Sequence, residues 1–148
     1  FAEYTRIDKK PSILHKERDG VTYELATYYV TFAKKVNGYL SSDHIVVGVT
    51  SKGHLASIRI GDINVFDDVT LDFDADVVNQ SISDKIVSAY QEKNIGVQNL
   101  QIGDQKIVVS PNGDIGMYSY VTFDMIDSDG DKQGTALDIF TVLGQKEQ

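Results

Sequence analysis

The stretch VNQSISDKIVSAYQEK, residues 78–93, decides the fold class because its apolar residues recur at helical rather than strand spacing. Most lie three or four positions apart, which gathers them on one face of an α-helix. They are Val78, Ile82, Ile86, Ala89 and Tyr90. Ser81 followed by Asp84 predicts a capping box near the start, and residues 94–96 predict the end. The sequence therefore predicts one amphipathic helix.

The residues before this helix favour β-strands. Residues 21–36 are rich in Tyr, Thr and Val, which pack well on a pleated sheet, and Asn37 and Gly38 then form a tight-turn signal. Residues 1–20 are charged and contain several turn signals, so we expect them to form a partly irregular arm.

A hairpin is predicted next. Residues 45–50 and 54–60 are both β-rich and are separated by a short loop that contains glycine. In the second run Ala56, Ile58 and Ile60 fall on one side of the strand, because side chains alternate between the two faces of a sheet. We expect that apolar side to be buried.

Four further β-like runs follow the helix, each bounded by Gly, Asp, Asn or Pro. They are residues 97–102, 106–110, 115–126 and 135–143. The third run alternates, with apolar residues such as Met117, Val121 and Phe123 on one face and Tyr118 and Tyr120 on the other. We expect the apolar face to pack against the helix.

These elements predict an α+β fold, in which antiparallel β-meander sheets are packed with one main amphipathic helix in a single domain of residues 1–148. Residues 49–55 and 109–115 echo each other as strand, glycine-containing turn and strand, which suggests two diverged halves, 21–66 and 76–143. Any hairpin with a glycine turn gives the same pattern, so the echo has two readings.

The arrangement resembles PepSY-type domains, which are small extracytoplasmic modules with a helix and a meander of strands. The resemblance rests on His44 to Leu55 after the tight turn and on Lys106 to Ile115 after the helix, and with flanking strands it covers most of residues 21–143. The first half departs from the family pattern because no helix precedes its strands. We carry no functional residue over from the family.

This resemblance implies binding or inhibition rather than catalysis. Family members are propeptide or regulatory segments of secreted peptidases, or envelope proteins and lipoproteins, often of Gram-positive bacteria. The resemblance thus implies an extracytoplasmic location and an envelope peptidase or cell-wall component as partner. The chain begins at Phe1, which suggests an upstream segment with a signal peptide or a membrane anchor.

Composition narrows the classes of partner. The net charge of -8 argues against nucleic acid and anionic membranes, because both attract clustered Lys and Arg. The chain has no cysteine, which excludes disulfides, thiolate nucleophiles and zinc–thiolate clusters. No apolar run approaches the ~18 residues that span a bilayer.

Acidic residues alternate in two places. Asp127, Asp129 and Asp131 have a spacing through which a loop can offer oxygen ligands to Ca²⁺. An EF-hand loop would need Gly and Glu where this chain has Lys132 and Asp138, and Asp and Gly also favour ordinary hairpin turns. We favour the turn and keep calcium as an alternative. A second trio is interpreted as the polar face of a strand: Asp72, Asp74 and Asp76.

The histidines predict no metal site. His15, His44 and His54 have no partner at a recognised ligand spacing, although His44 and His54 could meet across the hairpin. Motifs of hydrolases, phosphate-binding loops and dinucleotide-binding folds are missing from the sequence. We therefore assign no catalytic, cofactor-binding or metal-binding residue and expect no cofactor. Tyrosines on the outer side of a sheet could instead form a partner surface.

Together these features predict a non-enzymatic, extracytoplasmic binding or regulatory module. Two alternatives stay open. One is a calcium-dependent or carbohydrate-directed adhesion module that uses residues 127–131, and the other is a small hydrolase with a carboxylate cleft. The sequence does not fix the oligomeric state.

Overall fold

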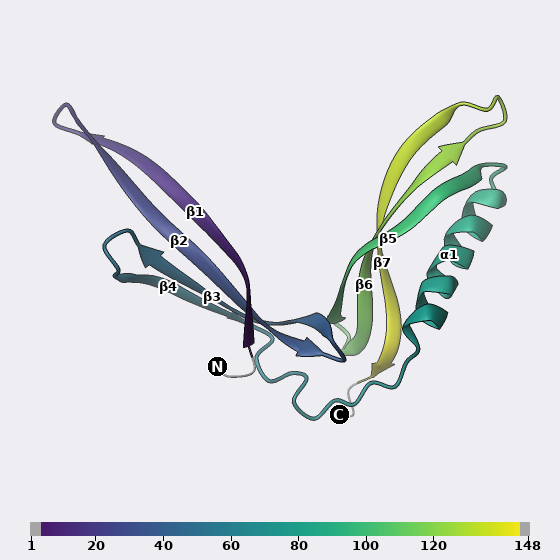
Figure 1. The fold of residues 1–148 in the computed structure, drawn as a ribbon, viewed down its shortest axis with the longest axis horizontal. Helices are drawn as coiled ribbons and strands as arrows, with labels where there is room; N and C mark the ends of the chain where they lie inside the picture. Colours follow the sequence, from purple (N-terminus) through teal and green to yellow (C-terminus); the bar gives the residue numbers. More distant parts are fainter. Residues whose placement is uncertain (1–3, 146–148) are drawn as a thin grey trace. The chain divides into compact units, whose positions relative to one another are not determined.

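The computed structural model of this chain describes residues 4–145 (Figure 1). The chain divides into two compact units, Phe1–Val69 and Thr70–Gln148, and each is described by itself. The boundary between the units falls between the two halves that the sequence suggested, residues 21–66 and 76–143.

The first unit is an antiparallel sheet with the strand order β1-β2-β3-β4. Its strands are β1 (Tyr4–Arg18), β2 (Val21–Val36), β3 (Tyr39–Thr50) and β4 (Leu55–Gly61). The β1–β2 hairpin extends beyond the β3–β4 turn, because β2 pairs with β3 only from Thr27 onward. The predicted strand 21–36, the turn at Asn37 and Gly38 and the next hairpin are confirmed.

The prediction of a partly irregular arm was wrong, because β1 pairs with β2 along almost its whole length. Polar residues form this strand since β2 supplies its backbone partners, whatever the local propensity. Pro11 is tolerated because β1 lies at the sheet edge and pairs only with β2. Residues 1–3 of the predicted arm lie outside the described residues.

The second unit consists of one helix and a three-stranded antiparallel sheet in the order β5-β6-β7. Its elements are α1 (Ala75–Gln91), β5 (Gly96–Val109), β6 (Asp114–Ile126) and β7 (Lys132–Gln145). Figure 1 shows α1 running along β5. The helix, the strand predicted at 115–126 and the strand predicted at 135–143 are confirmed with slightly different ends.

The core of this unit lies between α1 and one face of the sheet. Val78, Ile82 and Ile86 are buried on the helix side, as the sequence predicted, whereas Ala89 is exposed. The opposing sheet residues are buried too: Ile107, Ile115, Met117, Val121 and Phe123. The Tyr90 ring meets the Phe123 ring edge-on, with 5.1 Å between centroids. Burial of these side chains is the main stabilising term for the unit.

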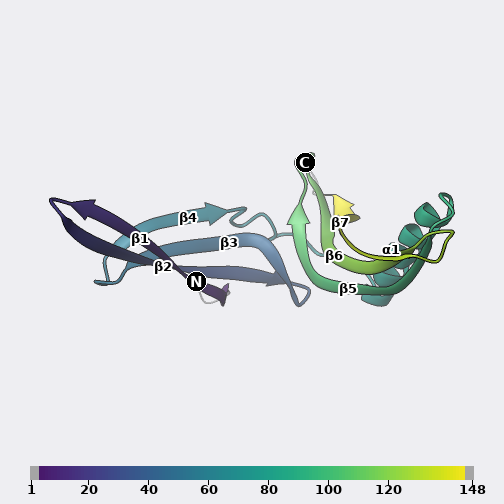
Figure 2. The ribbon, with the colours of Figure 1, turned by 90° about the horizontal axis from the view of Figure 1, so that it is seen from above.

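Strand β5 is continuous, although the sequence predicted two separate runs, 97–102 and 106–110. The register with β6 shifts twice, between Gln98 and Gln101 and between Ile102 and Gln105. Such β-bulges bend a strand without ending it. Figure 2 shows the resulting curve of β5 and β6.

The predicted α+β class was wrong, because the described residues are 64% strand and only 12% helix. The sequence identified the single helix correctly. The sequence underestimated the strand content, because polar residues in 4–18 and polar residues with a glycine in the bulged middle of β5 are typical of loops. The fold is mostly β.

The helix begins at Ala75 with Asp74 as its N-cap, so the predicted capping box of Ser81 and Asp84 was wrong. The Asp74 carboxylate accepts hydrogen bonds from the backbone N–H groups of Asp76 at 2.8 Å and Val77 at 3.3 Å. Asp74 and Asp76 of the acidic trio therefore form the helix start and Asp72 precedes it, so the trio is not the face of a strand. An acidic side chain here satisfies unpaired N–H groups and meets the positive end of the helix dipole.

We expect Asp74→Ala to lower the free energy of unfolding by about 1 kcal/mol, because it removes the helix cap. Asp72→Ala is the matched control, since Asp72 is exposed and lies outside the helix. Urea denaturation of both variants measures the difference. Equal midpoints for the two variants would contradict this assignment of the cap.

Candidate binding surface

One face of the first sheet is apolar across three strands. Residues that lie directly opposite each other on neighbouring strands share a face. Three successive rows across β2, β3 and β4 are apolar on the same face. They are Phe32, Ile45 and Ile60; Val30, Val47 and Ile58; and Tyr28, Val49 and Leu55. These nine residues are named the open face below.

The open face is exposed to solvent, most of all along β4. Leu55, Ile58 and Ile60 are 62%, 55% and 58% exposed, and the other six residues are partly buried apart from the buried Ile45. Residues 4–69 contribute no helix or second sheet that could cover these rows. The expectation that this side of the hairpin is buried was therefore wrong. Alternation shows which side of a strand is apolar but not whether another layer covers it.

A buried carboxylate lies at one end of the open face. Asp43 lies two positions before Ile45 on the same side of β3 and is fully buried. It accepts a hydrogen bond from the Tyr4 hydroxyl at 2.6 Å and another from the backbone N–H of Asn64 at 3.0 Å. Sequence reasoning did not single out this residue, although its spacing from Ile45 places it on the apolar side.

Residues 62–69 form the loop that covers this end of the sheet. Phe66 is buried, and the Asp67 carboxylate pairs with the Lys34 ammonium. Together with the bond from Asn64 to Asp43, these contacts hold the loop against the sheet. The rows nearest the β3–β4 turn lie away from this loop, which leaves them accessible to a partner.

Burial and the bond to Asp43 raise the pKa of Tyr4 to about 12. Since folding raises this pKa, the stability contributed by the neutral phenol is complete below the ordinary value of about 10 and is lost as pH rises through about 12. We expect the free energy of unfolding to fall between these pH values in the wild type and to fall less in Tyr4→Phe. The exposed Tyr23 provides the control variant Tyr23→Phe. An equally steep fall in Tyr4→Phe would refute the coupling.

Two cationic side chains border the open face along β1. Arg6 lies opposite Phe32 and Lys9 lies opposite Val30, so both are on the same side of the sheet as the open face. The Lys9 ammonium is 5.0 Å from the centroid of the Tyr28 ring, at cation–π distance. Sequence reasoning missed these residues because it expected residues 1–20 to be irregular. A positive rim therefore adjoins the apolar rows in a chain with a net charge of -8.

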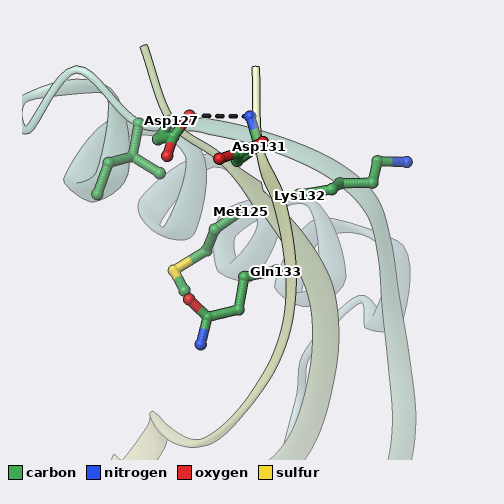
Figure 3. A pocket seen from close by; sticks show the side chains of 6 residues that line it. Met125, Asp127, Asp131, Lys132 and Gln133 are labelled. Carbon is green, nitrogen blue, oxygen red and sulfur yellow. Dashed lines mark hydrogen bonds between the residues drawn. The ribbon is translucent and has the colours of Figure 1, made fainter. Parts of the chain in front are cut away.

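A hollow of about 590 Å³ lies in the second unit beside the β6–β7 turn (Figure 3). It is lined by Ile95, Met125, Asp127, Asp131, Lys132 and Gln133. Figure 3 shows Met125 and Gln133 side by side, with the Lys132 side chain pointing away from them. Its two carboxylates, Asp127 and Asp131, belong to the β6–β7 turn. We base no function on it.

Three hairpin turns of the chain share one hydrogen-bond pattern. In each of the loops 50–54, 110–114 and 127–131, the first residue's N–H donates to the carbonyl of the fifth, and the fourth residue's N–H donates to the carbonyl of the first. The fourth residue is always a glycine with positive φ: Gly53, Gly113 and Gly130. The echo between residues 49–55 and 109–115 thus reflects a turn type that also occurs a third time.

The first side chain of each turn completes this pattern. Thr50 and Ser110 each accept the backbone N–H of the fifth residue at 3.1 Å through the hydroxyl, and Asp127 does so at 2.9 Å through its carboxylate. Asp127 also accepts the N–H of Asp129 at 3.0 Å. Within residues 4–145, no three His, Asp or Glu side chains converge as metal ligands. Turn chemistry accounts for this loop, and no observation favours calcium.

We expect Asp127→Ala to destabilise the second unit by about 1 kcal/mol, because two backbone N–H groups lose their acceptor. Asp127→Ser should retain much of that stability, since Ser110 fills the same role in the neighbouring turn. Thermal unfolding with and without Ca²⁺ measures both points. A rise in the midpoint with Ca²⁺ that is lost in Asp127→Ser would instead indicate a metal site.

The three histidines do not come together. His15 and His54 are exposed, whereas His44 is partly buried with Nδ1 at 2.6 Å from the carbonyl oxygen of Ser42. His44 lies opposite Gly61, at the end of the β3–β4 ladder away from the turn that carries His54. The structure therefore places the two histidines of the hairpin at opposite ends of it.

Aromatic residues also lie on the outer face of the second sheet, where the sequence offered tyrosines as a candidate partner surface. Tyr120 and Phe140 are 45% and 38% exposed. Tyr118 lies between them, and a hydrogen bond from its hydroxyl to Asp138 raises its pKa. The Lys106 ammonium lies 5.1 Å from the centroid of its ring. This face is more polar than the open face and is the weaker candidate for binding protein.

No known protein family, no curated protein and no solved structure matches this chain. None of its described residues form a helix that is both long and apolar enough to cross a bilayer.

Proposed function

We propose that this chain is a non-enzymatic binding module that uses the open face of the first sheet to hold another protein. One observation supports the proposal, namely the three apolar rows that residues 4–69 leave without a covering layer. A sheet with one apolar face is stable when that face is buried against a second layer. A partner would supply that layer.

The size of the open face supports this function. Full burial of one Leu or Ile side chain stabilises a protein by about 1.5–3 kcal/mol. At about 25 cal/mol per Å², this free energy corresponds to roughly 60–120 Å² of apolar surface for each side chain. Leu55, Ile58 and Ile60 each leave more than half of their surface exposed, and the partly buried residues add to this. These three residues alone thus expose roughly 100–200 Å² of apolar surface, and apolar patches of a few hundred Å² mark interaction sites on soluble proteins.

The chemistry of the open face favours one of the expected partner classes. None of its nine residues is charged, and only Tyr28 carries a polar side-chain group. A cell-wall glycan presents many hydroxyl groups that need hydrogen-bond partners, whereas a protein can offer apolar side chains. We therefore propose a protein partner such as an envelope peptidase. The PepSY-like pattern supports a regulatory role and a location outside the cytoplasm.

A paired substitution on the open face tests this function. Ile58→Lys with Ile60→Lys should abolish most of the fluorescence of a bound hydrophobic dye and the retention of envelope proteins by the immobilised full chain. Val77→Lys with Val87→Lys is the matched control, because it adds the same charge at two exposed aliphatic residues of α1. Equal dye binding and equal retention in both double variants would rule out the open face as the binding surface.

A further inference from the structure

The dimensions of the open face fit one α-helix. It is three strands wide, and neighbouring strands are about 4.8 Å apart, so its outer strands are separated by about 10 Å. An α-helix with its side chains is about 10 Å across. Along β2 the rows run from Tyr28 to Phe32, about 13 Å, which three helical turns of about 16 Å would cover.

The second unit shows that a single helix can cover such a face. Its sheet is also three strands wide and antiparallel, and α1 lies over it with Val78, Ile82 and Ile86 toward the strands. At the centre of that sheet Met117 and Val121 are 0% exposed. The outer strand of the open face remains more than half exposed because residues 4–69 contain no counterpart of α1.

Charge indicates which helix would fit. Arg6 and Lys9 border the open face along β1, so acidic residues beside the apolar stripe of a helix would meet them. A second copy packed face to face would offer no acidic residue from its own nine face residues. It would also bring together two chains that each carry a net charge of -8.

Building on the proposed function, we propose that the open face binds one amphipathic α-helix of a partner protein, with acidic residues beside its apolar stripe. The helix takes the place on the first sheet that α1 takes on the second. Apolar side chains three and four positions apart lie along β3, and the acidic flank lies over β1.

The experiment uses the cysteine-free full chain with one cysteine introduced. Ile58→Cys carries an environment-sensitive fluorophore on the open face, and Arg59→Cys carries it on the opposite side of the same strand. The probe is a synthetic peptide of residues 75–91 with Gln80→Lys, joined to Asp84 by a lactam. These positions are exposed and already bonded in α1. A control peptide carries Ile82→Asp and Ile86→Asp.

We expect the intact peptide to shift the fluorescence of the label at residue 58 saturably, and the control peptide to leave it unchanged. The label at residue 59 should respond at least tenfold less. A peptide with glutamate at positions 79, 81, 83 and 85 should bind the open face several-fold more tightly than a peptide with lysine at the same four positions.

Three outcomes would overturn the proposal. The label shows no saturable response up to about 1 mM peptide, or it responds equally to the intact and control peptides. The third outcome is that light scattering shows a dimer of the unliganded chain in which the label at residue 58 is protected. The last would assign the face to a second copy. If dye binding still depends on Ile58 and Ile60 while the peptide fails, only the helix is wrong. If dye binding fails as well, the binding function is wrong too.

Discussion

Replacing Gly116 with alanine is expected to lower the free energy of unfolding by about 3 kcal/mol, at the upper end of the usual cost of overpacking. A Cβ atom at this buried position would lie 2.5 Å from the carbonyl oxygen of Thr141 and 2.5 Å from Cζ of Phe140. The phenylalanine ring could turn away, but the carbonyl belongs to the β6–β7 ladder. Relief would require the two strands to move apart.

Gly134→Ala is the matched control, because Gly134 lies in β7 and its nearest neighbouring atom would be 3.8 Å from the new Cβ. We expect its free energy of unfolding to stay within about 0.5 kcal/mol of the wild type. Urea denaturation of both variants measures the difference. If the two glycines tolerate alanine equally well, then Phe140 and Thr141 do not pack on β6 as described.

The sequence predicted those parts of the fold that depend on patterns within one segment. The spacing of Val78, Ile82 and Ile86 determines which side of α1 is apolar, and alternation does the same for Met117 and Val121 in β6. Each pattern lies within one element. The structure confirms that both faces are buried, and the Tyr90 ring of α1 meets the Phe123 ring of β6.

Features that depend on distant partners could not be predicted in this way. Residues 4–18 form a strand because β2 lies alongside, and Gly116 is needed because Phe140, 24 positions later, covers it. Local composition contains neither fact. A run of polar residues with one proline resembles a loop until its partner strand is known.

The candidate site shows the same limit. Alternation correctly placed Ile58 and Ile60 on one side of β4, but their burial depends on whether another layer covers them, and the expectation of burial was wrong. The rim of Arg6 and Lys9 was missed because it exists only once β1 pairs with β2. The binding surface thus arises from correct local patterns in an unexpected tertiary context.

Asp43→Ala is the second substitution with a large expected effect, a loss of about 3 kcal/mol in the free energy of unfolding. The Asp43 carboxylate is 0% exposed and accepts hydrogen bonds from Tyr4 and from the backbone of Asn64. Alanine would remove this acceptor from both donors, each of which is hydrogen-bonded to the buried carboxylate in a partly buried contact. It would also remove one of the contacts that hold the loop 62–69 against the end of the open face, so dye binding there should rise.

Ser42→Ala is the neighbouring control, because the Ser42 hydroxyl is buried and has no hydrogen-bond partner among the described residues. Removing an unsatisfied polar group costs nothing in lost bonds and relieves its desolvation, so we expect a free energy of unfolding equal to the wild type or about 1 kcal/mol higher. Opposite effects from adjacent residues would show that hydrogen bonding, and not general packing, stabilises this end of the sheet. A loss in Ser42→Ala as large as that in Asp43→Ala would attribute the stability to packing instead.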